Sequence, residues 1–153
     1  MNIVRPENTA VIAYLAGHPR AVPQVVKPDA FRDPYYTLGS HPDVVERVWD
    51  QLATGMLKRC RRVICGSPAL IELHSGIIFA IAIGTQYGLR LPAELPMAAV
   101  RAGARTHTKW SDGTETNIQE IFGPDWVFGA WLKQEPEWCQ QAFQVYSTME
   151  QAG

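Results

Sequence analysis

Apolar residues recur at helical spacing in the segment that begins at Ser40. The repeating positions lie three or four residues apart and so share one helix face: Val44, Val45, Val48, Trp49, Leu52, Met56 and Leu57. Ser40 is a good N-cap residue, and Pro42 suits the first turn of a helix. Basic residues follow from Lys58 to Arg62, where the negative end of the helix dipole favours them. The pattern predicts a long helix near residues 41–59.

Short β-branched and apolar runs separated by turn residues follow this helix. The runs that we assign to strands are residues 62–65, 69–73, 77–83 and 87–91. The third run is apolar at every position, which is typical of a central strand buried on both faces. In the fourth run apolar residues alternate with Gly88 and Arg90, so we expect one solvated face there. Together the runs predict an antiparallel meander of three or four strands.

The second half of the chain adds two helices and a hairpin to this meander. We expect a short helix near 93–102, a hairpin of residues 106–110 and 114–118, an irregular aromatic strand within 122–131 and a C-terminal helix near 135–150. The hairpin prediction depends on Ser111-Asp112-Gly113, which is a typical turn sequence. We therefore predict the α+β class, as a single domain in which an antiparallel sheet packs against helices.

Residues 1–39 differ from the rest, because they hold five of the eleven prolines. Proline lacks a backbone donor and restricts the residue before it, so long helices and central strands are disfavoured here. We predict a proline-rich arm over residues 1–39, with one short helix at 9–16, packed on an α+β domain of residues 40–153. A flexible arm that binds a partner is the alternative. The apolar run 11–16 is too short for a signal sequence, so we expect a cytoplasmic location.

Composition narrows the classes of protein further. Hydrophobic residues make up 46% of the chain and charged residues 19%, which is typical of a globular domain rather than a disordered chain. The longest apolar run, 77–83, is too short to span a membrane. The three cysteines have no spacing typical of a zinc site, and we expect no metal and no cofactor. A P-loop, a dinucleotide fingerprint and an HExxH motif are all absent from the sequence, which favours a non-enzymatic protein.

The order helix, meander, helix, hairpin, helix is loosely similar to that of small single-domain proteins of the YjbR and TfoX N-terminal type. The residues that carry the resemblance are Phe79-Ala80-Ile81-Ala82 followed by Tyr87-Gly88-Leu89-Arg90. The resemblance covers about half of the chain. It implies an α+β fold and assigns no functional residue.

Charge is divided unevenly along the chain, although the net charge is only −1. Residues 1–110 hold 13 basic and 8 acidic side chains, whereas residues 111–153 hold 1 basic and 7 acidic. Such a division produces either a basic and an acidic docking face or two sets that pair with each other in the fold. Pairing within the fold is the simpler outcome. Among the functions we favour a non-enzymatic interaction protein, such as an immunity protein, an inhibitor or an adaptor, for which one of the two sets would form a docking face. The partner-binding residues that we expect are Arg59, Arg61, Arg62, Trp126, Trp131, Glu135 and Glu137. For the aromatic segment 122–131, packing in the core and the wall of a small-molecule pocket are the alternatives to an interface.

Two other functions stay open at this point. The first is a small enzyme or ligand-binding domain for an anionic small molecule, with Arg90, His107 and Lys109 holding the anion and Asp112 acting as a base. The second is weak binding of nucleic acid, with Arg59, Arg61 and Arg62 as the cations and Trp110, beside Lys109, as a platform on which a base could stack. The isoelectric point of about 6.4 lies below the range of dedicated nucleic-acid binders, so this function is the least favoured.

Overall fold

Five strands form an antiparallel sheet in the order β1-β2-β3-β4-β7. The computed structural model describes residues 3–17 and 40–150. The sheet strands are β1 (Arg61–Ile64), β2 (Ser67–Ile71), β3 (Ile78–Ile83), β4 (Gln86–Arg90) and β7 (Trp126–Phe128). A separate two-stranded hairpin consists of β5 (His107–Lys109) and β6 (Glu115–Asn117). The predicted meander and hairpin are both confirmed.

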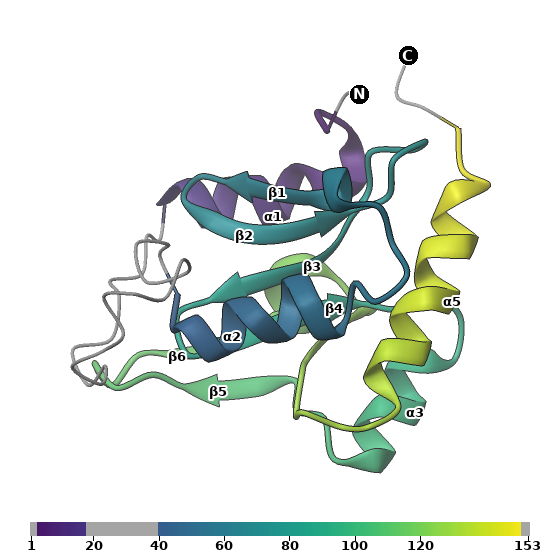
Figure 1. The fold of residues 1–153 in the computed structure, drawn as a ribbon. Coiled ribbons are helices and arrows are strands. Elements are labelled where there is room, and N and C mark those ends of the chain that lie inside the picture. The colour runs from purple at the N-terminus through teal and green to yellow at the C-terminus, as the bar shows by residue number, and fades with distance from the viewer. Residues whose placement is uncertain (1–2, 18–39, 151–153) are drawn as a thin grey trace.

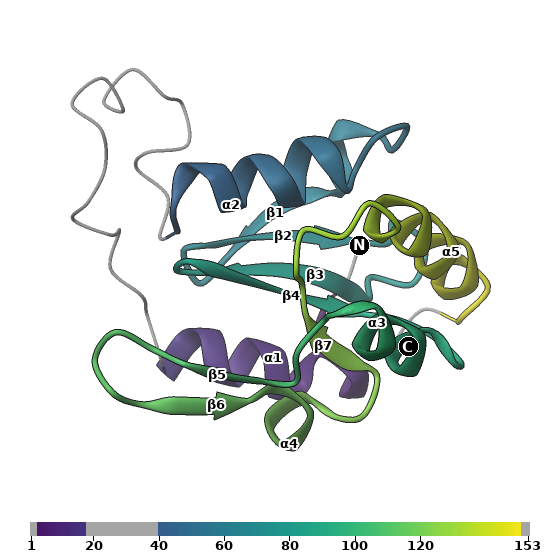
Figure 2. The ribbon, with the colours of Figure 1, turned by 90° about the horizontal axis from the view of Figure 1, so that it is seen from below.

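Helices cover both faces of this sheet, so the molecule has three layers (Figures 1 and 2). The α-helices are α1 (Pro6–Gly17), α2 (Pro42–Glu46), α3 (Leu95–Ala102), α4 (Ile118–Phe122) and α5 (Glu135–Ser147). In Figure 2, α2 lies above the sheet, whereas α1, α4 and the hairpin lie below it. This is the predicted α+β class in a single domain.

The helix near residues 41–59 is shorter and less regular than predicted. A π-helical segment (Arg47–Gln51) continues α2, and a separate 3₁₀ turn (Lys58–Cys60) precedes β1. The Ser40 cap is also wrong, because the side chain of His41 accepts the Asp43 N–H at 3.1 Å. Ser40 is buried instead, and its hydroxyl accepts the Gly84 N–H at 3.1 Å. A tertiary contact with the sheet thus outweighs the local capping preference of serine.

Strand boundaries near the first hairpin also differ from the prediction. Cys65 and Gly66 both have positive φ angles, 49° and 82°, so the turn is a two-residue turn that matches the twist of the strands. Pro68, expected in the turn, lies within β2. The predicted hairpin strand 114–118 ends earlier, at Asn117, whose side chain caps the short helix α4, and this helix was not predicted.

Two apolar clusters fill the space between the layers. The cluster beside α2, α3 and α5 includes Val48, Leu70, Phe79, Leu89 and Tyr146. The cluster beside α1 and the hairpin includes Val11, Ile71, Ile81, Trp110, Ile118 and Trp126. The expected solvated face of 87–91 is wrong, because Gly88 is buried where a Cβ would lie 2.8 Å from the Ile118 side chain.

The helix α1 is longer than the predicted 9–16 and is joined to the domain by a buried asparagine. The Asn8 side chain donates to the carbonyls of Ile3 and Gly76 and accepts the Ile78 N–H at 3.0 Å. Residues 18–39 of the predicted arm lie outside the described residues. None of the helices in residues 3–17 and 40–150 is long and apolar enough to cross a membrane.

Candidate binding surfaces

The expected partner-binding residues do not share one surface. Arg59, Arg61 and Arg62 lie at β1, the first strand in the sheet order, whereas Trp131 follows β7, the last strand. Glu137 lies exposed in the first turn of α5. The structure therefore offers two separate surfaces, one at each edge of the sheet.

Trp126 and Glu135 lie in the interior, and we remove both from the partner-binding set. Each residue is only 1% exposed. Trp126 packs edge-on against Phe122, with ring centroids 5.1 Å apart, so its large ring belongs to the core. Glu135 is held by an internal ion pair with Arg47. Aromatic residues and acids at helix starts occur both on protein surfaces and in the interior. Only the tertiary contacts show that Trp126 and Glu135 are interior residues.

The first surface, which we call the basic edge, consists of Leu57, Lys58, Arg59, Arg62 and Val63. Leu57 is 58% exposed and Val63 is 51% exposed, so each offers an apolar surface to a partner. The three basic residues are exposed and form no ion pair within the part of the chain that the structure describes. The neighbouring Arg61 differs, since it pairs with Asp50 at 3.0 Å.

The backbone of this edge has a donor and an acceptor that face away from the sheet. Ile64 pairs with Ser67 and Val63 with Pro68 across the hairpin. In a two-residue hairpin the residues that flank the turn exchange hydrogen bonds, and the next pair does not. The N–H and C=O of Val63 therefore point away from β2. The N–H of Arg61, which shares this orientation, donates to the Lys58 carbonyl.

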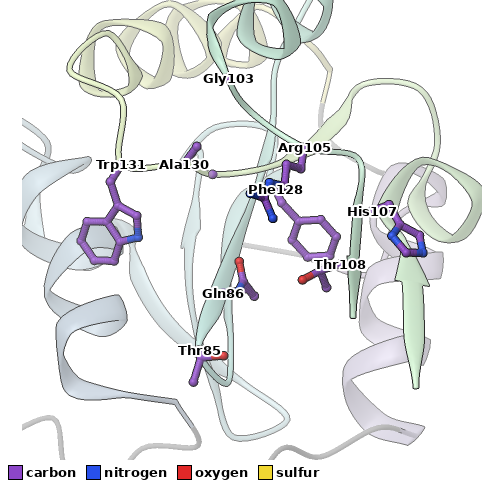
Figure 3. Close-up of a pocket in the computed structure, with 10 residues that line it drawn as sticks. Thr85, Gln86, Gly103, Arg105, His107, Thr108, Phe128, Ala130 and Trp131 are labelled. Atoms are coloured by element: carbon purple, nitrogen blue, oxygen red, sulfur yellow. The ribbon is translucent and has the colours of Figure 1, made fainter. Parts of the chain in front are cut away.

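The second surface contains a hollow of about 320 Å³, which we call the Trp131 hollow. Its walls come from Thr85 and Gln86 before and in β4, from Gly103 and Arg105 after α3, from His107 and Thr108 in β5, and from residues 128–131. In the view of Figure 3, Trp131 and His107 lie on opposite sides, and Arg105 and Gln86 lie between them. Among the residues that the structure describes, Arg105 and His107 are the charged or titratable side chains of the lining, and none of the described carboxylates lines it.

A buried polar network lies behind the Trp131 hollow. The Glu135 carboxylate accepts the Tyr87 hydroxyl, an Arg47 Nη2–H at 3.0 Å and the Ala130 N–H at 2.8 Å. Arg47 also donates to the Leu132 carbonyl at 2.7 Å. Burial raises the pKa of Tyr87, and its hydrogen bond to Glu135 raises it further, so the hydroxyl stays a donor at neutral pH. The network joins the π-helical segment, β4 and the start of α5.

This network fixes Trp131 in an unusual backbone conformation. The φ angle of Trp131 is +58°, in the left-handed region that bulky residues rarely occupy. Its N–H donates to the Tyr87 hydroxyl at 2.8 Å, and its ring packs edge-on against Tyr87 with centroids 5.4 Å apart. The Arg47 guanidinium lies 5.5 Å from the ring centroid. The indole is nevertheless 49% exposed, so the fold holds a solvent-facing tryptophan in one pose.

The residues expected to hold an anion do not converge on this hollow. Of Arg90, His107, Lys109 and Asp112, only His107 lines it. Arg90 lies over the Tyr146 ring and donates to the Glu7 carbonyl at 3.1 Å. Asp112 accepts the N–H and hydroxyl of Thr114 and so closes the hairpin turn. Lys109 lies exposed on the hairpin.

Several residues of the hollow had no signal in the sequence. Arg105 is one of several scattered basic residues, and Arg47, which belongs to the network behind the hollow, falls on the polar face of the predicted helix. Gly129 has the clearest signal in the sequence. A Cβ at this position would lie 1.8 Å from the Tyr87 ring, so only glycine fits. A glycine between aromatic residues indicates such close approach, although it does not name the neighbour.

The two halves of the charge division pair with each other only in part. Arg90 and Asp125 form such a pair at 3.6 Å, and Arg47 and Glu135 form another at 3.0 Å. The residues of the basic edge take no part in this pairing within the described chain. In residues 3–17 and 40–150 no group of three or more His, Cys, Asp or Glu side chains is arranged to hold a metal ion.

Comparison with protein-family models, with curated proteins and with solved structures found no match to this chain. The likeness in element order to the YjbR and TfoX N-terminal type is therefore not extended to function.

Proposed function

We propose that this chain is a non-enzymatic interaction protein that binds an acidic, extended segment of a protein partner along the basic edge. The observation that carries the proposal is the composition of this edge. It combines a terminal strand, two exposed aliphatic side chains, and three basic side chains without an ion pair in the described chain. Strand addition to an open edge is a common mode of peptide recognition.

Charge on an edge strand normally prevents unwanted pairing between sheets. Here the charges are all basic, so a second copy of the same edge is repelled and an acidic segment is attracted. The edge thus excludes self-association of this strand while it stays open to a partner of opposite charge.

The strand pattern also indicates the pattern of the partner. Successive side chains point to opposite faces of a strand, so Arg62 and Val63 face opposite ways. A strand added beside β1 would place its residues directly across from them, where opposite charges and apolar pairs are stabilising. We therefore expect the bound segment to alternate acidic and apolar residues.

The test is affinity capture from a nuclease-treated native lysate at low and moderate salt. We expect the wild-type protein to retain a partner in stoichiometric amount and the R59E/R62E variant to lose it. The control variant R101E/K133E changes the net charge equally at exposed positions outside the basic edge, and should retain the partner. Equal capture by both variants would contradict the proposed surface, and capture of nucleic acid alone from an untreated lysate would contradict the class of partner.

Defined peptides then separate charge from strand addition. A peptide that alternates Glu and Val should bind, and one that alternates Lys and Val should not. The variant V63P removes the outward N–H, which forms no hydrogen bond with β2, together with the valine side chain, whereas V63A removes the side chain and keeps the N–H. V63P should weaken binding of the Glu–Val peptide more than V63A does. Unchanged binding to V63P would show that the peptide does not add to the sheet.

A further inference from the structure

The Trp131 hollow lies at the sheet edge opposite the basic edge and has a different chemistry. Arg105 gives it a positive charge, His107 also lines it, and no acidic side chain of residues 3–17 and 40–150 does. His107 Nε2 lies 3.9 Å from Oε1 of Glu115, and Glu115 does not line the hollow. Arg105 is exposed and forms no ion pair with any residue that the structure describes. The guanidinium of Arg105 and the imidazole of His107 can both donate hydrogen bonds to the oxygens of a phosphate.

The opposite wall offers a flat aromatic surface. Trp131 is about half exposed, and its backbone and ring are both held by Tyr87. A left-handed tryptophan is costly to the fold, and such strain concentrates at binding sites. Since the buried ion pair of Arg47 and Glu135 fixes Tyr87, the indole is positioned before any ligand arrives. A pre-positioned ring loses little freedom when a second flat ring stacks on it.

The space between these walls is small and polar. A volume of about 320 Å³ lies at the low end of ligand pockets, which span about 300–1,000 Å³. Thr85, Gln86 and Thr108 line it and provide hydroxyl and amide groups for hydrogen bonds. This space suits one ring with one phosphate and is short for a dinucleotide.

We propose that the Trp131 hollow binds a small phosphorylated molecule with a flat ring, of the nucleoside monophosphate class. Arg105 and His107 hold the phosphate, the exposed indole of Trp131 stacks on the ring, and Gln86 and the two threonines bond the polar groups between them. The site does not depend on the basic edge, so either proposal stands if the other fails.

Isothermal titration calorimetry on the full chain tests this site with AMP and UMP as probes. Adenosine, which lacks the phosphate, and inorganic phosphate, which lacks the ring, are the matched ligands. We expect both nucleotides to bind and both fragments to bind at least about tenfold more weakly, since charge-assisted bonds and stacking each contribute a factor of that order. Phosphate affinity equal to that of AMP would overturn the role of the ring.

Variants assign the binding to this hollow. R105Q should weaken AMP binding about tenfold or more, whereas R101Q, an exposed arginine of α3 that does not line the hollow, should leave it unchanged. W131G removes the indole but tolerates the left-handed backbone, and it should also weaken binding about tenfold. Absence of binding heat at millimolar AMP and UMP would overturn the proposal. Equal affinity of R105Q and the wild type would also overturn it.

Discussion

Removal of the Glu135 carboxylate by Glu135→Ala breaks the polar network behind the Trp131 hollow. The wild-type carboxylate accepts bonds from Tyr87, Arg47 and Ala130, and it is almost wholly buried. In the variant the Arg47 guanidinium, 8% exposed, keeps its charge and loses its counter-ion. The Tyr87 hydroxyl and the Ala130 N–H lose their acceptor at the same time.

The expected loss of unfolding free energy is about 3–5 kcal/mol, the range for removal of one partner from a buried ion pair. The remaining acceptors of Arg47, the Leu132 carbonyl at 2.7 Å and the Gln51 side chain at 2.9 Å, place the loss toward the lower end. The three lost bonds are coupled, so their separate values do not add. A domain with about 5–15 kcal/mol of stability would stay folded over most of this range.

Urea denaturation followed by circular dichroism measures this loss. The control is Glu137→Ala, which removes an exposed acid from the same first turn of α5 and should cost only about 0.3–1 kcal/mol. A difference of less than 1 kcal/mol between the two variants would refute the reasoning. The double variant R47M/E135A should cost clearly less than the sum of its single changes, because the second change removes the stranded charge.

Four further predictions concern Gly129, Trp131 and the cysteines. Gly129→Ala places a Cβ 1.8 Å from the buried Tyr87 ring and should cost 1–3 kcal/mol or more by urea denaturation, whereas Gly17→Ala, which meets nothing within 4 Å, should cost well under that range. Trp131→Gly should be more stable than Trp131→Ala by roughly 1 kcal/mol, because only glycine occupies the left-handed region freely, and the opposite order would contradict the φ angle of +58°. Burial raises the pKa of the Cys139 thiol, which therefore stays protonated in the folded protein after it ionises in the unfolded chain. Below about pH 8.5 the thiol is protonated in both states and does not lower the unfolding free energy. Above that pH only the unfolded chain loses the proton, which lowers the unfolding free energy. The unfolding free energy should therefore fall less between pH 8 and 10 in C139A than in the wild type. A thiol reagent should label only Cys65 rapidly in the native protein, since the other two cysteines are buried.

The sheet could be predicted from the sequence because its signals are local. Residues 77–83 are apolar on both faces, and Ser111-Asp112-Gly113 separates two short alternating runs. Each of these patterns has one stable outcome in a domain of this size, a buried central strand in the first case and a hairpin in the second. The strand boundaries shifted by one or two residues, because Cys65 and Gly66 alone form the turn before β2.

The prediction of a long helix near 41–59 was wrong, because tertiary contacts outweigh local preference in this segment. Apolar spacing continues through Met56, but the regular α-helix ends at Glu46, where the π-helical segment carrying Arg47 begins. The Arg47 side chain reaches Glu135, 88 positions further along the chain. Spacing within a segment contains no information about such a partner.

The candidate sites divide along the same line. The basic edge could be predicted from the sequence, since Arg59 and Arg62 lie close together in the sequence and stay exposed. The Trp131 hollow could not, because residues from four separate segments line it and its key tryptophan has a backbone conformation that no sequence pattern indicates. Glu135 was read as a surface acid for the same reason.

The most direct test of the proposed function is hydrogen exchange at the Val63 amide, with and without an acidic partner segment. This N–H points away from β2 and should exchange rapidly in the free protein. The proposal predicts that the bound segment protects Val63 strongly and leaves the hairpin amides of β5 and β6 unchanged. Binding that leaves Val63 unprotected would contradict strand addition at the basic edge.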